Sequence, residues 1–241
     1  MVNLKTDLLK AVFDTYDLVA SAFATACTRD CRTCCTQNVL ATTLEVDLIL
    51  KFLEQSDRHD LLALCREKRS EDRLKPALTI NELAEHCLSR QEPVQSDVLP
   101  GDAPCPLRVE DGCAIYSVRP FSCRSMWSER PCVPGGSAIV NPLVVTLNGV
   151  LEQIIEHVDD GGLSGNMLDV LTFLSDRDRR EAFAGFVALE PAEGLRATRP
   201  NPGFIVLPEH RPHVISLLNR LWERDVGSGS FREVMARLRT G

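Results

Sequence analysis

Four thiols lie within nine residues in the stretch Cys27-Thr28-Arg29-Asp30-Cys31-Arg32-Thr33-Cys34-Cys35. A second, wider group of cysteines follows and consists of Cys105, Cys113, Cys123 and Cys132. Core packing does not require such a density of small side chains, whereas a metal site made of thiolates does. The two groups therefore predict all-sulfur ligation of zinc or of an iron–sulfur cluster.

The spacing within the first group suits a turn that points several sulfurs at one ion. Cys31 and Cys34 are separated by two residues, which allows a turn to present both to the same metal. Cys27 precedes Cys31 by four residues, which on a helix places it one turn away on the same face. Cys34 and Cys35 are adjacent, so their side chains diverge by about 100° on a helix. We therefore expect one of this pair to face a second centre or to remain a free reactive thiol.

The second group has seven, nine and eight residues between its successive cysteines. These gaps are too wide for a compact zinc knuckle, but they suit a loop that wraps around an ion. Eight thiolates can form two four-sulfur sites or one cluster of higher nuclearity, and the spacing leaves both arrangements open. No general base, nucleophile or substrate pocket can be named from this pattern.

The residues around the cysteines suit a negatively charged centre. Zinc with four thiolates has a net charge of about −2, which neighbouring cations and N–H donors stabilise. Arg119 and Arg124 lie within a few residues of Cys123, and Tyr116 lies close to Cys113. We expect these three side chains to shape and neutralise the centre rather than to take a direct catalytic role.

A family resemblance rests on the order of these motifs over residues 27–132. They read Cys27-x3-Cys31-x2-Cys34-Cys35, then Cys105-Pro106, then Cys113-x2-Tyr116-x2-Arg119-Pro120-x2-Cys123-Arg124, and finally Cys132. This combination closely resembles the YkgJ-type cysteine-cluster family, which is described as a zinc- or iron-chelating domain with eight cysteines. The resemblance implies that all eight cysteines are metal ligands. The same pattern occurs in flagellin lysine methylases, which are thought to carry an iron–sulfur centre, so the resemblance implies a metal firmly and an activity only loosely.

We favour an iron–sulfur cluster of the 4Fe–4S type over zinc, because the vicinal cysteine pair and the nearby aromatic residues suit a bulky cluster better. Three classes of function stay open. The first is an enzyme or redox protein that uses the cluster, with a protein substrate or a redox partner. The second is a structural zinc protein without catalysis, and the third is a metal-handling or metal-sensing protein. Metal ions are the expected partners in all three.

Other interpretations of the cysteines are weaker. The spacing Cys27-x3-Cys31-x2-Cys34 also occurs in radical-SAM enzymes, but that fold needs alternating strands and helices. Cys65 and Cys87 lie beside apolar helix positions, and we interpret both as core residues. A disulfide framework is disfavoured because the chain begins without a signal-peptide pattern, and reduced thiols are the rule in the cytoplasm, where we place the protein.

Composition limits the remaining possibilities. The chain has 241 residues, of which 44% are hydrophobic and 25% are charged, which is typical of a globular protein. The net charge of −7 argues against nucleic-acid binding through bulk attraction to phosphates. The sequence contains no apolar stretch near the ~20 residues that span a bilayer, so no membrane partner is expected.

Hydrophobic periodicity predicts a mainly α-helical protein with an irregular cysteine-ligated region and few or no short strands. The first helix is expected to run directly into Cys27. Capping boxes should begin three later helices, at Thr42 with Glu45, at Thr79 with Glu82 and at Ser230 with Glu233. The expected helices cover residues 4–23, 42–52, 61–68, 79–90, 147–158, 167–174, 179–187, 211–224 and 231–239.

Prolines and glycines divide this pattern. Residues 91–136 should be irregular, because they are rich in both residue types and contain the whole second cysteine group. Short strands are possible at 138–140 and 204–207, and the glycine-rich run 161–165 predicts a hinge. We accordingly divide the chain into a cysteine-cluster region, 1–136, and a helical region, 137–241, packed against each other as one unit.

Overall fold

The computed structural model describes residues 2–91, 100–110, 112–133 and 136–240. Within these ranges it is mainly α-helical, as predicted, with five short strands. The helices are α1 Val2–Ala20, α2 Thr43–Gln55, α3 His59–Glu67, α4 Ile80–Leu88, α5 Phe121–Ser125, α6 Pro142–Val158, α7 Met167–Leu174, α8 Arg177–Ala184, α9 Arg211–Trp222 and α10 Phe231–Thr240. The strands are β1 Leu40–Thr42, β2 Arg108–Val109, β3 Gly112–Cys113, β4 Leu163–Asn166 and β5 Leu195–Ala197.

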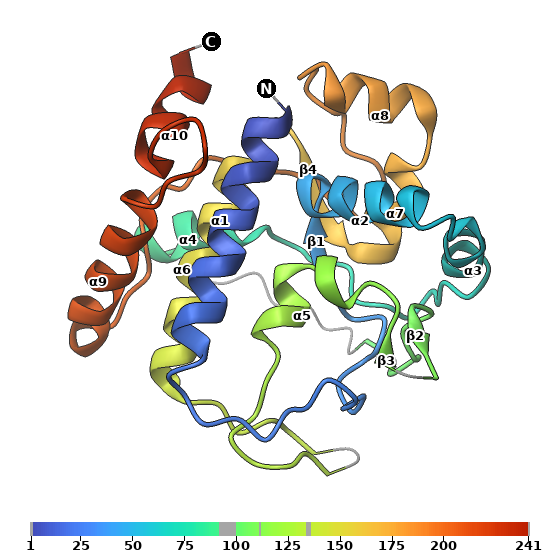
Figure 1. Cartoon of the computed structure of the whole chain (residues 1–241), viewed down its shortest axis with the longest axis horizontal. Helices are drawn as coiled ribbons and strands as arrows, with labels where there is room; N and C mark the ends of the chain where they lie inside the picture. Colours follow the sequence, from blue (N-terminus) through green and yellow to red (C-terminus); the bar gives the residue numbers. More distant parts are fainter. Residues whose placement is uncertain (1, 92–99, 111, 134–135, 241) are drawn as a thin grey trace.

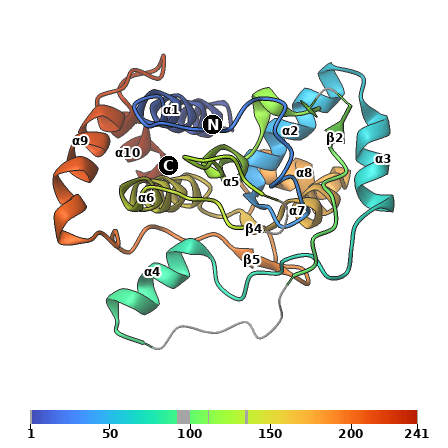
Figure 2. The ribbon, with the colours of Figure 1, turned by 90° about the horizontal axis from the view of Figure 1, so that it is seen from below.

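Helix α1 packs against α6 at the centre of the fold, and the two lie side by side in both ribbon views (Figures 1 and 2). The apolar stripe predicted for the first helix forms this contact, since Leu8, Val12 and Tyr16 are buried. Helices α9 and α10 also contact α1, whereas α2 and α7 pack against each other on the other side. The core therefore joins elements from both halves of the chain.

Three helices begin at the capping boxes that were predicted from the sequence. Thr42 and Glu45 form the complete capping box of α2, and Thr79 and Glu82 form that of α4. Ser230 and Glu233 exchange the same pair of hydrogen bonds at the start of α10. Each box satisfies backbone amides that a helix start would otherwise leave without acceptors.

A three-stranded antiparallel sheet in the order β1–β4–β5 was not predicted. Its central strand pairs Gly165 with Ala41 on one side and with Leu195 on the other. A Cβ atom at Gly165 would lie 2.9 Å from the carbonyl oxygen of Gly194, so the close approach of the strands requires glycine here. The predicted hinge at 161–165 is therefore wrong for most of its length, because the run enters a strand.

The strands expected at 138–140 and 204–207 are also wrong, since neither segment forms a strand or any other regular element. The hydroxyl of Ser128 accepts from the amide of Ile139 and donates to its carbonyl oxygen, which also accepts from the amide of Glu129 at 2.8 Å, so these bonds hold the first segment as a loop. Residues 91–136 contain only short elements among those described, and 92–99, 111 and 134–135 lie outside the described residues.

The first helix ends earlier than predicted, at Ala20 instead of running into Cys27. Ser21, Ala22 and Phe23 form turns, and the amide of Ala26 donates to the carbonyl oxygen of Ser128 at 2.8 Å. The helical-turn relationship expected between Cys27 and Cys31 is therefore wrong. Among the described helices, none is long and apolar enough to cross a membrane.

Candidate functional site

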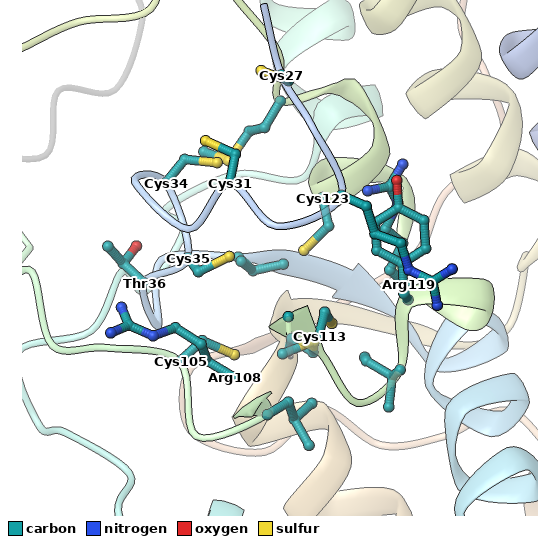
Figure 3. Close-up of a pocket in the computed structure, with 18 of the residues that line it drawn as sticks. Cys27, Cys31, Cys34, Cys35, Thr36, Cys105, Arg108, Cys113, Arg119 and Cys123 are labelled. Carbon is teal, nitrogen blue, oxygen red and sulfur yellow. The ribbon is translucent and has the colours of Figure 1, made fainter. Parts of the chain in front are cut away.

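A cavity of about 100 Å³ opens beside β2, β3 and the start of α5, and cysteine dominates its lining (Figure 3). Seven of the eight cysteines predicted as ligands line it, from segments that are far apart in the sequence. These are Cys27, Cys31, Cys34, Cys35, Cys105, Cys113 and Cys123. The structure thus brings most of both cysteine groups to one place.

Backbone pairing joins the two cysteine groups. The amide of Cys105 donates to the carbonyl oxygen of Cys35 at 3.0 Å, and the amide of Gln37 donates to that of Ala103 at 2.9 Å. Thr36 and Pro104 form an antiparallel bridge between these two bonds. This short ladder aligns the end of the first group with the beginning of the second.

The thiols occupy two parts of the cavity (Figure 3). Cys35 lies with Cys105, Cys113 and Cys123, and the charges of these three act on its thiol. Cys27, Cys31 and Cys34 gather in the other part. The thiols of Cys34 and Cys35 share a hydrogen bond, and the charge of Cys34 also acts on Cys123, so the two parts of the cavity adjoin at the vicinal pair.

Backbone and side-chain hydrogen bonds fix some of these thiols. The Sγ atom of Cys27 accepts a hydrogen bond from the amide of Ser128 at 3.3 Å. The thiol of Cys31 donates to Oγ1 of Thr33 at 3.8 Å. Backbone N–H donors to sulfur stabilise thiolates and lower the charge cost of a metal–thiolate centre.

The thiols of Cys105, Cys113 and Cys123 are buried enough to resist ionisation in the absence of a cation. Burial raises the pKa of Cys105 to about 11, and burial also raises the pKa values of Cys113 and Cys123. The hydrogen bond between the vicinal thiols raises the pKa of Cys34 and lowers that of Cys35. A bound metal cation reverses this preference, because coordination deprotonates a thiol outright.

Arginine side chains surround the cavity. Arg29, Arg108 and Arg119 all line it. The guanidinium carbons of Arg119 and Arg29 lie 4.1 Å and 5.0 Å from the ring centre of Tyr116, which also lines the cavity. The Nε atom of Arg119 is buried and has no hydrogen-bond partner among the described residues. Positive charge therefore lies beside the thiols, as a negatively charged centre requires.

Two of the predicted residues lie outside the cavity lining. Cys132 is not among the lining residues, although it lies in a described segment. Arg124 packs over the ring of Phe13 at 4.3 Å and pairs with Asp17, so it faces α1. Of the two cysteines interpreted as core residues, Cys65 is buried and Cys87 is exposed. The prediction for Cys87 is wrong because the last turn of α4 lies outside the core, where Leu88 is exposed as well.

The donor chemistry of this cavity suits a thiolate centre, but the sulfurs are not arranged as a finished coordination site. Among the described residues, no three side chains of His, Cys, Asp or Glu are grouped closely enough to hold a metal ion. Sequence reasoning also missed the other side chains of the wall. Met126, Met167 and Val39 contribute apolar surface, and nothing in their local sequence indicates this role.

The chain matches no protein-family model, no curated protein and no solved structure.

Proposed function

We propose that the cysteine-lined cavity binds an all-thiolate metal centre, and that an iron–sulfur cluster is its preferred occupant. The observation that carries the proposal is the convergence of seven cysteines from two distant groups on one cavity. Packing alone does not require so many thiols in one place, and the rest of the lining, within the described residues, carries three arginines and no carboxylate. The resemblance of the sequence motifs to the YkgJ-type family supports the same conclusion.

The four thiols of Cys35, Cys105, Cys113 and Cys123 are the foremost ligand set. They share one part of the cavity, and each of the last three influences the thiol of Cys35 electrostatically. Four cysteine thiolates are the usual ligand number for a 4Fe–4S cluster and for structural zinc. Because the sulfurs do not yet form a coordination site, binding requires them to approach one another.

The other three thiols have a less complete set of partners. Cys27, Cys31 and Cys34 would form a second site only with a further ligand, for which Cys132 is the candidate from the sequence. Alternatively, all these thiols would hold one larger cluster. Arg29, Arg108 and Arg119 would neutralise the negative charge of either arrangement.

An iron–sulfur centre would supply one-electron transfer in a redox or protein-modifying reaction. A structural zinc protein is the second candidate function, because the same ligand number and the short ladder at Cys35 and Cys105 suit a metal that only holds loops together. A metal-handling protein is the third, and the partial exposure of the first cysteine group is the observation that favours it.

Anaerobic purification followed by iron, zinc and acid-labile sulfide analysis separates these functions. Iron and sulfide in equal amounts, with visible absorption that bleaches on reduction by dithionite, would support the iron–sulfur proposal. Colourless protein with tightly held zinc and no sulfide would support the structural alternative. Rapid transfer of metal to a chelator would favour metal handling. Protein that neither contains nor takes up any of these metals would contradict all three.

A further inference from the structure

A second cavity lies next to the cysteine-lined cavity, and helix α5 contributes to the walls of both. Phe121 and Ser122 line the second cavity, whereas Cys123 lines the first. The second cavity has a volume of about 310 Å³. This volume lies at the lower end of the range of small-molecule sites, about 300–1,000 Å³. Strand β1, helices α4 and α6, and the loop residues 74–79 supply most of the rest of its wall.

The wall of this second cavity is mainly apolar. Its aliphatic side chains include Leu40, Leu74, Leu78, Ile80, Leu83 and Ile155. A small apolar group placed here would lose its contact with water and gain close contacts with these side chains. The cavity therefore has the shape and surface for an organic ligand rather than for a bare ion.

Three carboxyl groups also line the cavity, and two of them have structural roles. Glu45 accepts hydrogen bonds from the backbone amides of Phe121 at 2.7 Å and Thr42 at 2.8 Å. Glu156 accepts hydrogen bonds from the backbone amides of Asn81 and Arg199, both at 2.9 Å. These two carboxyl groups are buried, and their role is to accept hydrogen bonds from backbone amides at helix starts and in a loop.

Glu152 differs from the other two carboxyl groups. Glu152 is half-buried, and among the described residues no side chain or backbone amide donates a hydrogen bond to it and no cation pairs with it. Burial and the charge of Glu45 raise its pKa to about 7. A carboxyl group without a partner in an apolar wall costs free energy, and such groups concentrate at ligand sites.

The ammonium group of Lys75 pairs with carboxylates outside the cavity lining. Lys75 lines the cavity, but its Nζ atom lies 4.0 Å from carboxylate oxygens of Glu71 and Glu193, which are both exposed. No described cation forms an ion pair with Glu45, Glu152 or Glu156. The cavity thus combines a mainly apolar wall with three carboxyl groups that have no cationic partner among the described residues.

We propose that this second cavity binds a small organic amine in its protonated form. The ammonium group would donate hydrogen bonds to the carboxylate of Glu152, which lacks a donor, and the apolar body would pack against the aliphatic wall. A cation is favoured over a neutral ligand because it also compensates the charges of three neighbouring carboxyl groups. The inference does not rest on metal binding, so each proposal can fail without the other.

Calorimetric titration with three probes of one shape tests this inference: cyclohexylamine, cyclohexanol and cyclohexanecarboxylate. The buffer should be held above the pKa of Glu152, so that this carboxyl group is ionised. We expect the amine to bind at least about 10-fold more tightly than the alcohol, since a charge-assisted hydrogen bond replaces a neutral one. We expect the carboxylate not to bind.

The variant Glu152→Gln tests the assigned residue. It removes the charge but keeps the shape, so the affinity for cyclohexylamine should fall about 10- to 100-fold while that for cyclohexanol stays unchanged. Because the substitution removes a half-buried carboxyl group that has no cationic partner among the described residues, the variant should fold at least as stably as the wild-type protein. Glu190→Gln, at an exposed position, is the matched control and should leave amine binding unchanged.

Three results would overturn the inference. They are equal affinity for the amine and the alcohol, undetectable binding of all three probes, and unchanged amine binding in a correctly folded Glu152→Gln variant. The first would point to an apolar pocket without charge recognition. The second would show that the cavity is not a ligand site, and the third would place the amine at another carboxylate.

Discussion

The carboxylate Oε1 atom of Glu45 accepts a hydrogen bond from the backbone amide of Phe121 at 2.7 Å, across 76 positions of sequence. Glu45 is also the third residue of helix α2 and completes the capping box with Thr42. The same buried carboxyl group therefore joins the start of α2 to the start of α5, two residues before Cys123. This bond links a local helix signal to the position of a predicted metal ligand.

Glu45→Gln should weaken both that link and the metal centre. A glutamine side chain has one acceptor oxygen, so either the Phe121 or the Thr42 amide loses its partner, at a cost of about 1–3 kcal/mol. We expect lower stability by urea unfolding and less bound metal per folded molecule. Glu82→Gln is the matched control, because Glu82 occupies the same place in the capping box of α4. Its metal content should stay at the wild-type level, and an equal loss in both variants would show that Glu45 has no special relation to the centre.

Arg119→Gln should reduce metal retention without unfolding the protein. Arg119 lines the cavity and rests on the ring of Tyr116, so its charge lies close to the thiols. Loss of a charged neighbour of metal ligands commonly lowers metal affinity by about 10-fold or more. Competition with a chelator measures this affinity. Arg130→Gln removes the same charge from an exposed loop position and should have little effect. Similar losses in both variants would indicate a nonspecific effect of net charge.

The contribution of Asp159 to stability should decrease as the pH rises from about 4 to above 7. Burial raises the pKa of Asp159 to about 7, which is above the value of an unfolded aspartate, so ionisation opposes folding. The contribution is fully present below the unfolded pKa and is lost as the pH passes the folded one, with an upper limit of about 4 kcal/mol. Glu152 acts in the same direction, since its pKa is also raised to about 7.

Asp159→Asn should therefore flatten this pH dependence without removing it. The substitution keeps an acceptor for the Thr43 hydroxyl, which lies 2.7 Å from Oδ2 of Asp159, and stays neutral at every pH. Urea unfolding at a series of pH values measures the slope for both proteins. A slope as steep in Asp159→Asn as in the wild-type protein would show that this carboxyl group is ionised at no cost in the folded state.

Cys31→Ser should lower the melting temperature of metal-loaded protein far more than Cys87→Ser. Cys31 lines the cavity, whereas Cys87 is exposed on α4. A serine oxygen replaces sulfur poorly as a ligand for iron–sulfur clusters or zinc, so the first variant loses binding free energy that is also folding free energy. Thermal unfolding followed by circular dichroism checks this. Equal shifts for both variants would remove Cys31 from the ligand set.

Most helices could be predicted from the sequence because their signals are local. Six of the eight residues of Met167–Leu174 are apolar, and the capping boxes at Thr42 and Thr79 are complete within four residues. The strands could not be predicted on the same basis. Strand β4 has the sequence Leu-Ser-Gly-Asn, which has little strand propensity, and it forms because β1 and β5 pair with it from distant parts of the chain.

The candidate site shows the same division between local and distant information. The density of cysteines identified seven of the residues that line the cavity, because core packing does not require so many thiols close together in the sequence. The bond from Glu45 to Phe121 and the position of Met167 in the wall depend on tertiary contacts, and no local pattern announces them. Glu152 was also missed, because one acidic residue in a helical pattern is expected to face solvent.

X-ray absorption at the metal edge of anaerobically purified protein tests the central claim most directly, because it reports which atoms are bonded to the metal. We predict sulfur alone around iron or zinc, at about 2.3 Å for zinc, with a loss of that signal in Cys35→Ser and Cys105→Ser and none in Cys87→Ser. Nitrogen or oxygen ligands in place of sulfur, or metal binding unaffected by Cys35→Ser and Cys105→Ser, would contradict a thiolate centre in this cavity.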